Sequence, residues 1–238
     1  MLRLADVHTY YGDSHVLQGV TLHVERGSVA AVLGRNGVGK TTLCRSIVGF
    51  TPARSGQVLF GGIDITRMPA HRIHGLRLGL VPQGRRVFPS LTVDEHLAIA
   101  SSVPSPRWDI RRVFDVFPRL EERRHHRGNE LSGGEQQMLA IGRALVANPV
   151  FVVMDEPTEG LSAASIAVVT GAIRRLQDEG TTVLLAEQNA AFAVTVADRV
   201  HVMSQGRIVH SSGAAELWDN EDIKAQFLGV RLAGKGTT

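Results

Sequence analysis

The chain has 238 residues, of which 43% are hydrophobic, enough to bury the core of one domain or of a domain with a subdivision. No apolar run approaches the roughly eighteen residues that a membrane-spanning helix needs, the first residues lack a secretory-signal pattern, and the single cysteine, Cys44, excludes an internal disulfide, so we expect a cytosolic protein. The formal net charge is +3, and the arginine-rich segments 85–86 and 123–127 are expected to be solvated faces rather than sites for acidic lipid, membrane-protein loops or nucleic acid.

The N-terminal segment predicts antiparallel strands. Apolar side chains recur at positions 2, 4 and 7 and again at 16, 20, 22 and 24, with Tyr10-Tyr11-Gly12 between the two stretches. Further along, residues 55–60 and 63–65 flank Gly61-Gly62, which predicts a β-hairpin.

Residues 34–42, GRNGVGKTT, have the pattern of a phosphate-binding loop. Such a loop wraps its backbone N–H groups around the phosphates of a nucleotide, and glycines tolerate the dihedral angles that this requires. A strand is predicted before it at 29–33 and a helix after it at 40–48, whose positive N-terminal end would face the phosphates. The residues predicted to bind nucleotide here are Gly34, Arg35, Asn36, Gly37, Gly39, Lys40, Thr41 and Thr42.

A helical region is predicted after the next buried strand, at 78–81, which ends in Pro82-Gln83-Gly84. Thr92 and Glu95 have the spacing of a capping box that begins a helix. Residues 102–106 are expected to interrupt it, and another helix is predicted at 110–117.

A second anion-binding surface is predicted in the run LSGGEQ at 131–136. Ser132 and Glu135 form a Ser-x-x-Glu capping box that opens an apolar-patterned helix at 137–147, and Gly133 and Gly134 expose backbone N–H groups beside the Ser132 hydroxyl. Taken alone, this pattern would indicate an ordinary helix cap. The phosphate loop upstream and the strand that follows favour a functional role.

That strand, predicted at 151–156, is an apolar run that ends in two carboxylates. Continuous apolar runs are typical of strands buried on both faces of a mostly parallel sheet. Asp155 is therefore expected at the carboxyl end of the strand, where it could hold the hydration shell of a Mg²⁺ ion that the Thr41 hydroxyl also ligates. Glu156, one residue later, would point elsewhere.

The rest of the chain alternates helices and strands. An apolar stripe predicts a helix at 165–177, strands are expected at 181–186 and 199–203 with an alanine-rich helix between them, and a hairpin is expected about Gly206. A short helix near 223–228 is expected to complete the core, and residues 234–238 are expected to be disordered.

These motifs together resemble the ATP-binding-cassette (ABC) ATPases, and the resemblance covers essentially the whole chain. It implies an α/β P-loop NTPase fold of ABC type, with a mixed sheet core, an antiparallel N-terminal β-subdomain and an inserted helical subdomain. Residues 1–238 would form one domain, with a catalytic core at 1–84 and 149–238 and the helical, signature-bearing subdomain at 85–148.

The resemblance also implies residue roles. Tyr11 matches the aromatic residue that stacks on adenine, although packing at a turn is an open alternative. Gln83 matches a glutamine that touches Mg²⁺ and the attacking water, and Glu156 matches the general base. The surface formed by Ser132, Gly133, Gly134 and Glu135 would close over ATP bound to the phosphate loop of a second subunit, head to tail.

Two positions depart from the family pattern. Most members have a histidine where this chain has Gln188, and glutamine can donate a hydrogen bond to the γ-phosphate but cannot become cationic or transfer a proton. Gln188 is therefore expected to sense the γ-phosphate and to contribute less to the rate. Ser162 replaces the usual aspartate in the loop that couples the two sites of a dimer.

The runs VPQGRRVFPSLTV, DEPTEGL and AEQN resemble ATPase subunits of importers for branched-chain amino acids, with relatives that serve amides or urea. This branch implies a second ATPase subunit, two membrane permease subunits, an indirect dependence on an extracytoplasmic solute-binding protein, and a place at the inner face of the membrane. Phe88 and its neighbouring arginines are candidates for the docking surface. No nucleic-acid partner is expected.

The sequence disfavours other classes of nucleotide-binding protein to different degrees. An exporter or lipid-transporter ATPase would share all of these catalytic motifs. A soluble ABC ATPase acting on nucleic acid or ribosomes usually has two cassettes or a coiled-coil insertion, and neither pattern is present. A phosphate-loop kinase or GTPase is disfavoured by the signature helix, and a GTPase also by the lack of an Asn-Lys-x-Asp motif.

Overall fold

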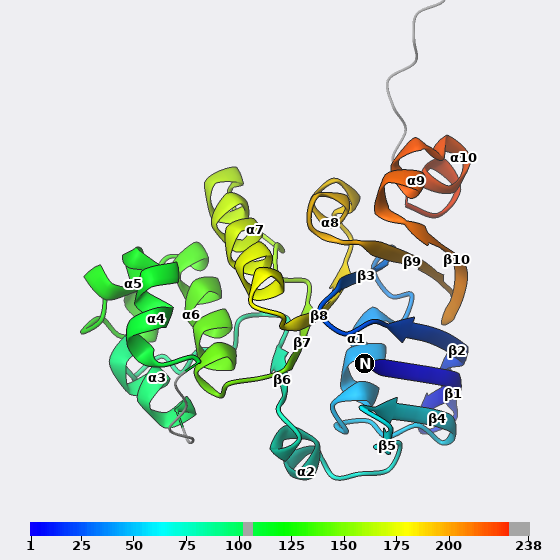
Figure 1. Cartoon of the computed structure of the whole chain (residues 1–238), viewed down its shortest axis with the longest axis horizontal. Coiled ribbons are helices and arrows are strands. Elements are labelled where there is room, and N and C mark those ends of the chain that lie inside the picture. Colours follow the sequence, from blue (N-terminus) through cyan, green and yellow to red (C-terminus); the bar gives the residue numbers. More distant parts are fainter. Residues whose placement is uncertain (102–106, 229–238) are drawn as a thin grey trace, which may run out of the picture.

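The computed structural model describes residues 1–101 and 107–228, which form two β-sheets and a separate group of helices (Figure 1). The predicted helix break at 102–106 and the predicted disorder at 234–238 lie outside these residues. None of the described helices combines the length and the apolar character that crossing a membrane requires.

The N-terminal sheet is antiparallel, as predicted, with the strand order β2-β1-β4-β5. A register shift in β1 between Leu4 and Val7 lets both residues face the core, where both are fully buried. β4 and β5 form the predicted hairpin, with Gly61 and Gly62 at positive φ. The strands are β1 (Leu2–Tyr11), β2 (Ser14–Val24), β4 (Ser55–Phe60) and β5 (Ile63–Asp64).

The central sheet has the order β10-β9-β3-β8-β7-β6, in which the β10–β9 pair is antiparallel and the other pairs are parallel. Along β7, Val152 and Met154 pack on one face while Phe151 and Val153 pack on the other. A strand buried on both faces must be apolar throughout, which explains the continuous run. The strands are β3 (Val29–Leu33), β6 (Leu78–Val81), β7 (Phe151–Asp155), β8 (Thr182–Glu187), β9 (Arg199–Ser204) and β10 (Arg207–Gly213).

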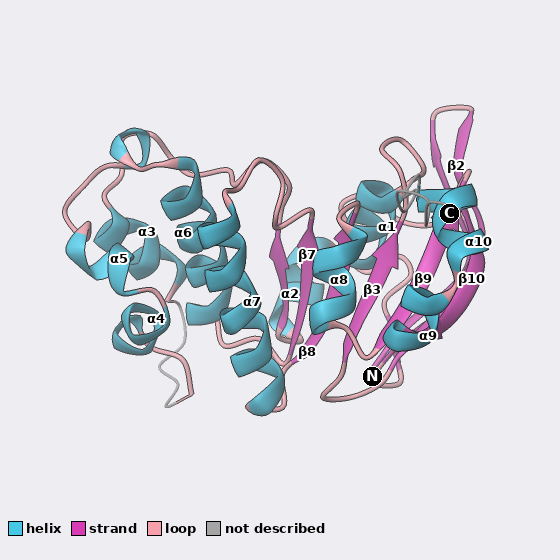
Figure 2. Cartoon of the chain, turned by 90° about the horizontal axis from the view of Figure 1, so that it is seen from above, coloured by secondary structure: helices cyan, strands magenta, loops and turns pink. Residues whose placement is uncertain are grey.

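Helices cover both faces of the central sheet (Figure 2). α1 (Lys40–Ile47) lies between the two sheets and contacts β2, β7 and β8. On the opposite face, α7 (Ala163–Asp178) packs on β8, and α8 (Ala190–Val196) packs on β3 and β8. The mixed α/β fold with its antiparallel N-terminal sheet is thus confirmed.

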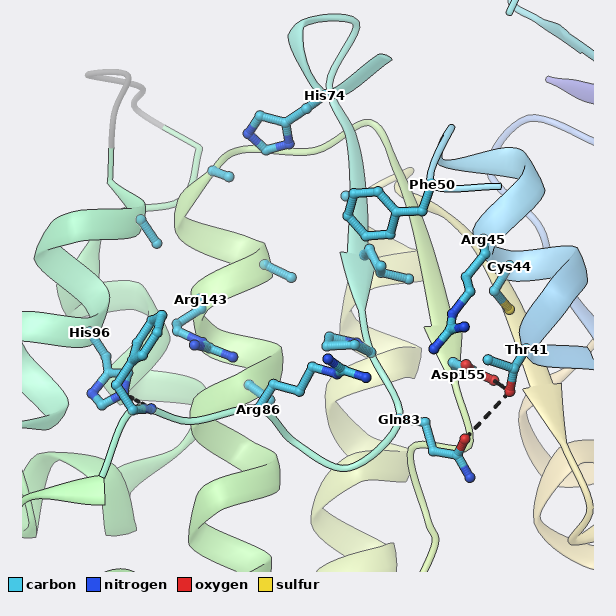
Figure 3. Close-up of a pocket in the computed structure, with 18 of the residues that line it drawn as sticks. Thr41, Cys44, Arg45, Phe50, His74, Gln83, Arg86, His96, Arg143 and Asp155 are labelled. Atoms are coloured by element: carbon cyan, nitrogen blue, oxygen red, sulfur yellow. Dashed lines mark hydrogen bonds between the residues drawn. The ribbon is translucent and has the colours of Figure 1, made fainter. Parts of the chain in front are cut away.

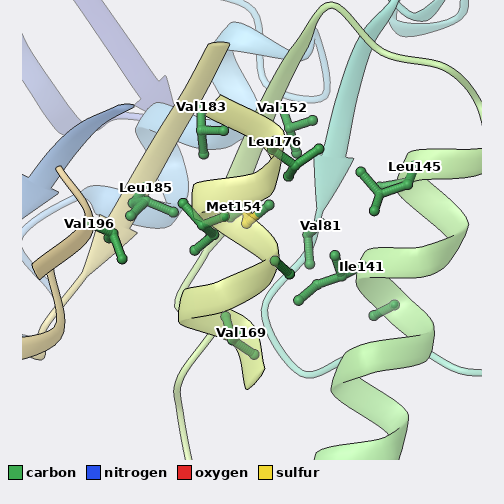
Figure 4. Packing of buried hydrophobic residues seen from close by; sticks show 14 of the residues in the cluster. Val81, Ile141, Leu145, Val152, Met154, Val169, Leu176, Val183, Leu185 and Val196 are labelled. Carbon is green, nitrogen blue, oxygen red and sulfur yellow. The ribbon is translucent and has the colours of Figure 1, made fainter. Parts of the chain in front are cut away.

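The separate helical group consists of α3 (Val93–Ala100), α4 (Ile110–Val116), α5 (Pro118–Glu122) and α6 (Gly133–Val146). Thr92 caps α3 with both hydrogen bonds of the predicted capping box. α6 joins this group to the sheet through β6, and Figure 4 shows Ile141 and Leu145 of α6 on the side of Val81. The helices therefore extend the sheet's core on one side.

Some boundaries differ from the predictions. α6 begins at Gly133 rather than at 137, because the Ser132 capping box satisfies the first N–H groups although glycine is a weak helix former. α2 (Ala70–Gly75), α5 and α9 (Ala214–Asp219) were not predicted, since helices this short show little periodicity. The helix expected near 223–228 is α10 (Glu221–Ile223) followed by a π-helical turn (Lys224–Leu228).

His201 of β9 makes the stability of this fold pH-dependent. Its side chain is 3% exposed and its Nδ1 lies 2.7 Å from the Ser211 hydroxyl. Burial, and secondarily the charge of Arg199, lower the pKa of His201 from 6.5 to about 4. A histidine with a lowered pKa favours folding above pH 6.5, and that stability is lost as the pH falls toward the folded-state pKa.

We expect the free energy of unfolding to fall by about 2 kcal/mol more in wild type than in His201→Asn between pH 8 and pH 5. Asparagine can still bond the Ser211 hydroxyl but does not titrate, and other titrating groups cancel in the comparison. Urea unfolding curves at both pH values measure the difference. Parallel pH profiles for the two proteins would contradict this assignment.

Candidate functional site

The phosphate loop lies between the end of β3 and the start of α1, as predicted. Gly37 and Gly39 have φ values of 80° and 112°, which side chains rarely adopt. A Cβ at Gly34 would lie 2.5 Å from the Met203 carbonyl oxygen of β9. The glycines of the motif are therefore required both by backbone conformation and by close contact with the sheet.

Lys40 lies at the centre of this loop with its ammonium group enclosed. The residue is 4% exposed, and its Nζ donates to the carbonyl oxygens of Gly34 at 2.8 Å and Arg35 at 3.0 Å. Nζ also lies 3.0 Å from Oε1 of Glu156. A cation with three acceptors in a buried loop forms a point of positive charge where the motif would hold phosphate.

Three oxygen-bearing side chains, from α1, β7 and the segment after β6, meet at one edge of a pocket (Figure 3). The Thr41 hydroxyl lies 3.2 Å from Oδ1 of Asp155 and 3.4 Å from Oε1 of Gln83. Burial raises the pKa of Asp155 to about 6, opposed by the Thr41 hydrogen bond. A carboxylate, a hydroxyl and an amide oxygen are hard donors of the kind that Mg²⁺ takes together with water, so this donor set fits that ion.

Glu156 is held in place by Gln83, which follows β6, the strand paired with β7. The Gln83 amide donates to Oε2 of Glu156 at 3.0 Å and to Oε2 of Glu159 at 3.1 Å. Glu156 is 9% exposed and has a φ of 49°, an uncommon conformation for a residue with a side chain. The turn directs the Glu156 carboxylate toward Lys40 and Gln83, while Asp155 completes the strand.

The LSGGEQ run forms the N-terminus of α6, in the helical group and apart from α1 (Figure 1). Ser132 accepts from the Glu135 N–H at 3.3 Å, and the Glu135 carboxylate accepts from the Ser132 N–H at 2.8 Å. A Cβ at Gly133 would lie 2.8 Å from the Arg85 guanidinium, and one at Gly134 would lie 2.4 Å from the Ser165 hydroxyl. The predicted capping box is present. Because Gly133 and Gly134 have no side chains, Arg85 and Ser165 can pack directly against the start of the helix.

The two adjacent tyrosines lie in different surroundings. The ring of Tyr10 stacks on His15 with centroids 4.1 Å apart, and the Arg54 guanidinium lies 4.1 Å from its centroid. Tyr11 is 42% exposed, and its hydroxyl accepts from Arg45 and Thr51, each at 3.4 Å. Tyr11 is thus the tyrosine with an accessible ring, and its hydroxyl is held beside α1.

The end of β8 carries a functional candidate, Glu187, that the sequence analysis does not identify. Gln188 lies where β8 ends, and its backbone N–H donates to Oε2 of Glu187 at 3.0 Å. Glu187 is 2% exposed, and in the sequence it stands out only as part of the AEQN run. A carboxylate directly after the apolar run 183–186 is the available signal. Ser162, the second departure, caps α7 by accepting from the Ser165 N–H at 3.3 Å.

A phosphate loop after a parallel strand, β3, with an acidic pair at the end of a second parallel strand, β7, one strand away in the same sheet, defines a P-loop NTPase. The chain belongs to the ABC transporter family, whose model matches residues 17–159. It is therefore a nucleotide-binding ATPase of the ABC class.

Three similar proteins match over nearly their whole length. The high-affinity branched-chain amino acid transport ATP-binding protein BraG of Pseudomonas aeruginosa is 41% identical, over 96% of this chain and 100% of that protein. The probable branched-chain amino acid transport ATP-binding protein LivF of Archaeoglobus fulgidus is 35% identical, over 97% and 99%. A solved nucleotide-free ATP-binding cassette from an ABC transporter is 28% identical with a TM-score of 0.82, covering 92% of this chain and 94% of that one.

Proposed function

We propose that this chain hydrolyses ATP to power an importer of branched-chain amino acids, at the inner face of the cell membrane. The observation that supports the chemistry best is the convergence of Lys40, Thr41, Gln83, Asp155 and Glu156 from three separate segments of the chain. The similarity to BraG and LivF over nearly their full lengths supports the substrate class.

In this proposal the phosphate loop and Lys40 bind the β- and γ-phosphates of ATP. Thr41, Asp155 and Gln83 would hold Mg²⁺, which neutralises phosphate charge when it is bound. Glu156 accepts a proton from the attacking water, and the Gln83 amide orients its carboxylate. Gln188 donates a hydrogen bond to the γ-phosphate.

The signature surface at Ser132 to Glu135 would serve a second subunit. Because it lies in the helical group and not beside the phosphate loop, it would complete the site of a partner ATPase arranged head to tail. ATP would close the pair, and hydrolysis would open it. We propose that the insert 85–148 moves as a lobe relative to the core of 1–84 and 149–238.

A groove of about 790 Å³ offers a place for the membrane subunits. Phe50, Phe88 and Ile99 line it and are 64%, 56% and 68% exposed. Large apolar side chains gathered in one groove mark an interaction site rather than an ordinary surface. The same groove reaches Thr41 and Asp155, so a docked segment would lie next to the nucleotide site (Figure 3).

Tyr11 tests the adenine contact. We expect Tyr11→Ala to weaken ATP binding about tenfold, because it removes a stacking surface, and Tyr11→Phe to change it little. Tyr10→Ala is the matched control, since that ring is packed against His15 and Arg54. Equilibrium titration with a fluorescent ATP analogue gives the affinities, and unchanged binding by Tyr11→Ala would support turn packing alone.

The first test of the proposed function is a mild-detergent pull-down of the tagged chain from its native cells, with partners identified by mass spectrometry. Two polytopic membrane proteins and a second ATPase are expected, and a co-recovered solute-binding protein would distinguish branched-chain amino acids from amides or urea. Ribosomal proteins or nucleic acid without membrane subunits would refute the transport assignment.

A variant in the groove lined by Phe50, Phe88 and Ile99 tests whether the membrane subunits bind there. We expect Ile99→Asp to lose the membrane subunits, because a charge would be buried at the proposed interface. Val209→Asp on β10 is the matched control, since Val209 is also exposed, at 43%, but lies outside the groove. Equal recovery of membrane subunits by both variants would rule out this docking surface.

A further inference from the structure

Glu187 is a buried carboxylate that the proposed chemistry does not use. It is the last residue of β8, 2% exposed, and none of the ion pairs among residues 1–101 and 107–228 includes it. Burial raises its pKa above the ordinary value. A buried charge without a counter-ion is costly, so the hydrogen bonds that it accepts must be substantial.

Four donors surround this carboxylate. Oε1 accepts from the Thr158 N–H at 3.0 Å and from the Thr158 hydroxyl at 2.7 Å. Oε2 accepts from the backbone N–H groups of Gln188 at 3.0 Å and Asn189 at 3.1 Å. One carboxylate oxygen therefore binds the segment at Thr158, and the other binds the segment at Gln188 and Asn189.

Those two segments both carry residues of the proposed site. Thr158 lies two residues after Glu156, in the loop 156–162 that ends at the cap of α7. Gln188 is the proposed γ-phosphate contact. The loop is also anchored at its start, because the Glu156 N–H donates to the Ala186 carbonyl oxygen at 2.8 Å. A shift of the backbone at Gln188 would thus act on the same carboxylate that holds the loop bearing Glu156.

We propose that Glu187 is a positioning residue that couples Gln188 to the loop 156–162, so that contact with the γ-phosphate fixes the position of the Glu156 carboxylate. The inference rests on the proposed ATPase site and adds a residue to it. Hydrogen bonds to an ionised acceptor are the strong ones, and one carboxylate shared by two segments makes their positions interdependent.

The variant Glu187→Gln keeps the shape of the side chain, but an amide can accept hydrogen bonds at only one of its two terminal atoms. One of its two terminal atoms is an NH₂ group, which would face either the Thr158 donors or the two backbone N–H groups. We expect kcat for ATP to fall about tenfold while KM changes less than twofold, because Glu187 bonds Gln188 through its backbone N–H and the variant leaves the phosphate loop, Lys40 and the Gln188 side chain unchanged. A merely structural role would lower the melting temperature without this separation of kcat from KM.

Two further variants make the result decisive. Thr158→Val removes one donor to Oε1, and in a double-mutant cycle its effect on kcat should largely disappear when Glu187→Gln is already present. Thr182→Val is the matched control, since it removes a partly buried hydrogen bond, from the Gly27 N–H, at the other end of the same strand. It should lower stability and leave kcat unchanged.

The assays use the assembled complex recovered from native cells, with basal ATPase activity as the readout. Glu187→Gln with a kcat within twofold of Thr182→Val would overturn the inference. If Glu187→Gln does not fold, Thr158→Val decides alone: a lowered kcat at unchanged KM supports the coupling, and an unchanged kcat refutes it. A wild-type complex without ATPase activity would instead refute the proposed function itself.

Discussion

Glu156→Gln is expected to lower ATP hydrolysis by about 10²- to 10³-fold while ATP binding persists. The amide occupies the same volume, and Lys40, 3.0 Å away, can bond its oxygen as it now bonds the carboxylate. What is lost is the ability to accept a proton from water. Because the γ-phosphate stays in place, we also expect the variant to accumulate as a closed, ATP-bound dimer, visible as a larger species in size-exclusion chromatography.

The chain offers a matched control for this experiment in Glu159. Its carboxylate accepts from the same Gln83 amide, at 3.1 Å against 3.0 Å for Glu156, but has no contact with Lys40 among the described ion pairs. Glu159→Gln should keep turnover within a fewfold of wild type and should not trap a dimer. Near-normal ATP turnover by Glu156→Gln would contradict the assignment of Glu156 as the general base.

Lys40→Ala is expected to weaken ATP binding by about 10- to 100-fold, since a charge-assisted hydrogen bond contributes about 1.5–3 kcal/mol. The change removes the only side-chain cation that the structure encloses within the phosphate loop and leaves the buried Glu156 carboxylate without its ion pair. Calorimetric titration with ATP measures the affinity, and the melting temperature measures the accompanying loss of stability.

Lys224 separates these two effects. It is equally buried, at 2% exposure, and its Nζ donates to the Trp218 carbonyl oxygen at 2.5 Å and to Glu221 at 2.6 Å, far from the nucleotide site. Lys224→Ala should therefore lower the melting temperature while ATP affinity stays within twofold of wild type. An equal loss of affinity in both variants would mean that binding depends on overall stability rather than on the Lys40 charge.

Local signals in the sequence accounted for much of this fold. The bounds of β3 and β6 agree with the predictions, because apolar runs that end at a glycine or a proline leave few alternatives, and those of β4 agree because Gly61-Gly62 marks the hairpin turn that ends it. The capping boxes at Thr92 and Ser132 are present with both of their hydrogen bonds. These features depend on residues a few positions apart, which a sequence displays directly.

Contacts between distant segments were harder to foresee. The Gln83–Glu156 hydrogen bond joins residues 73 positions apart, and only the pairing of β6 with β7 brings them together. The role of Glu187 depends in the same way on Thr158, 29 positions earlier. The individual residues of the site could be identified by motif, but their partners could not, because register between parallel strands is a tertiary property.

The separation of the signature run at the start of α6 from the phosphate loop at the start of α1 has a consequence for regulation. If each ATP needs both surfaces, a free chain in dilute solution meets a partner only by collision, and its hydrolysis rate rises with the square of its concentration. Attachment to one membrane assembly raises the effective concentration of the second chain to the millimolar range. Assembly would thus protect the cell against futile hydrolysis by unassembled subunits.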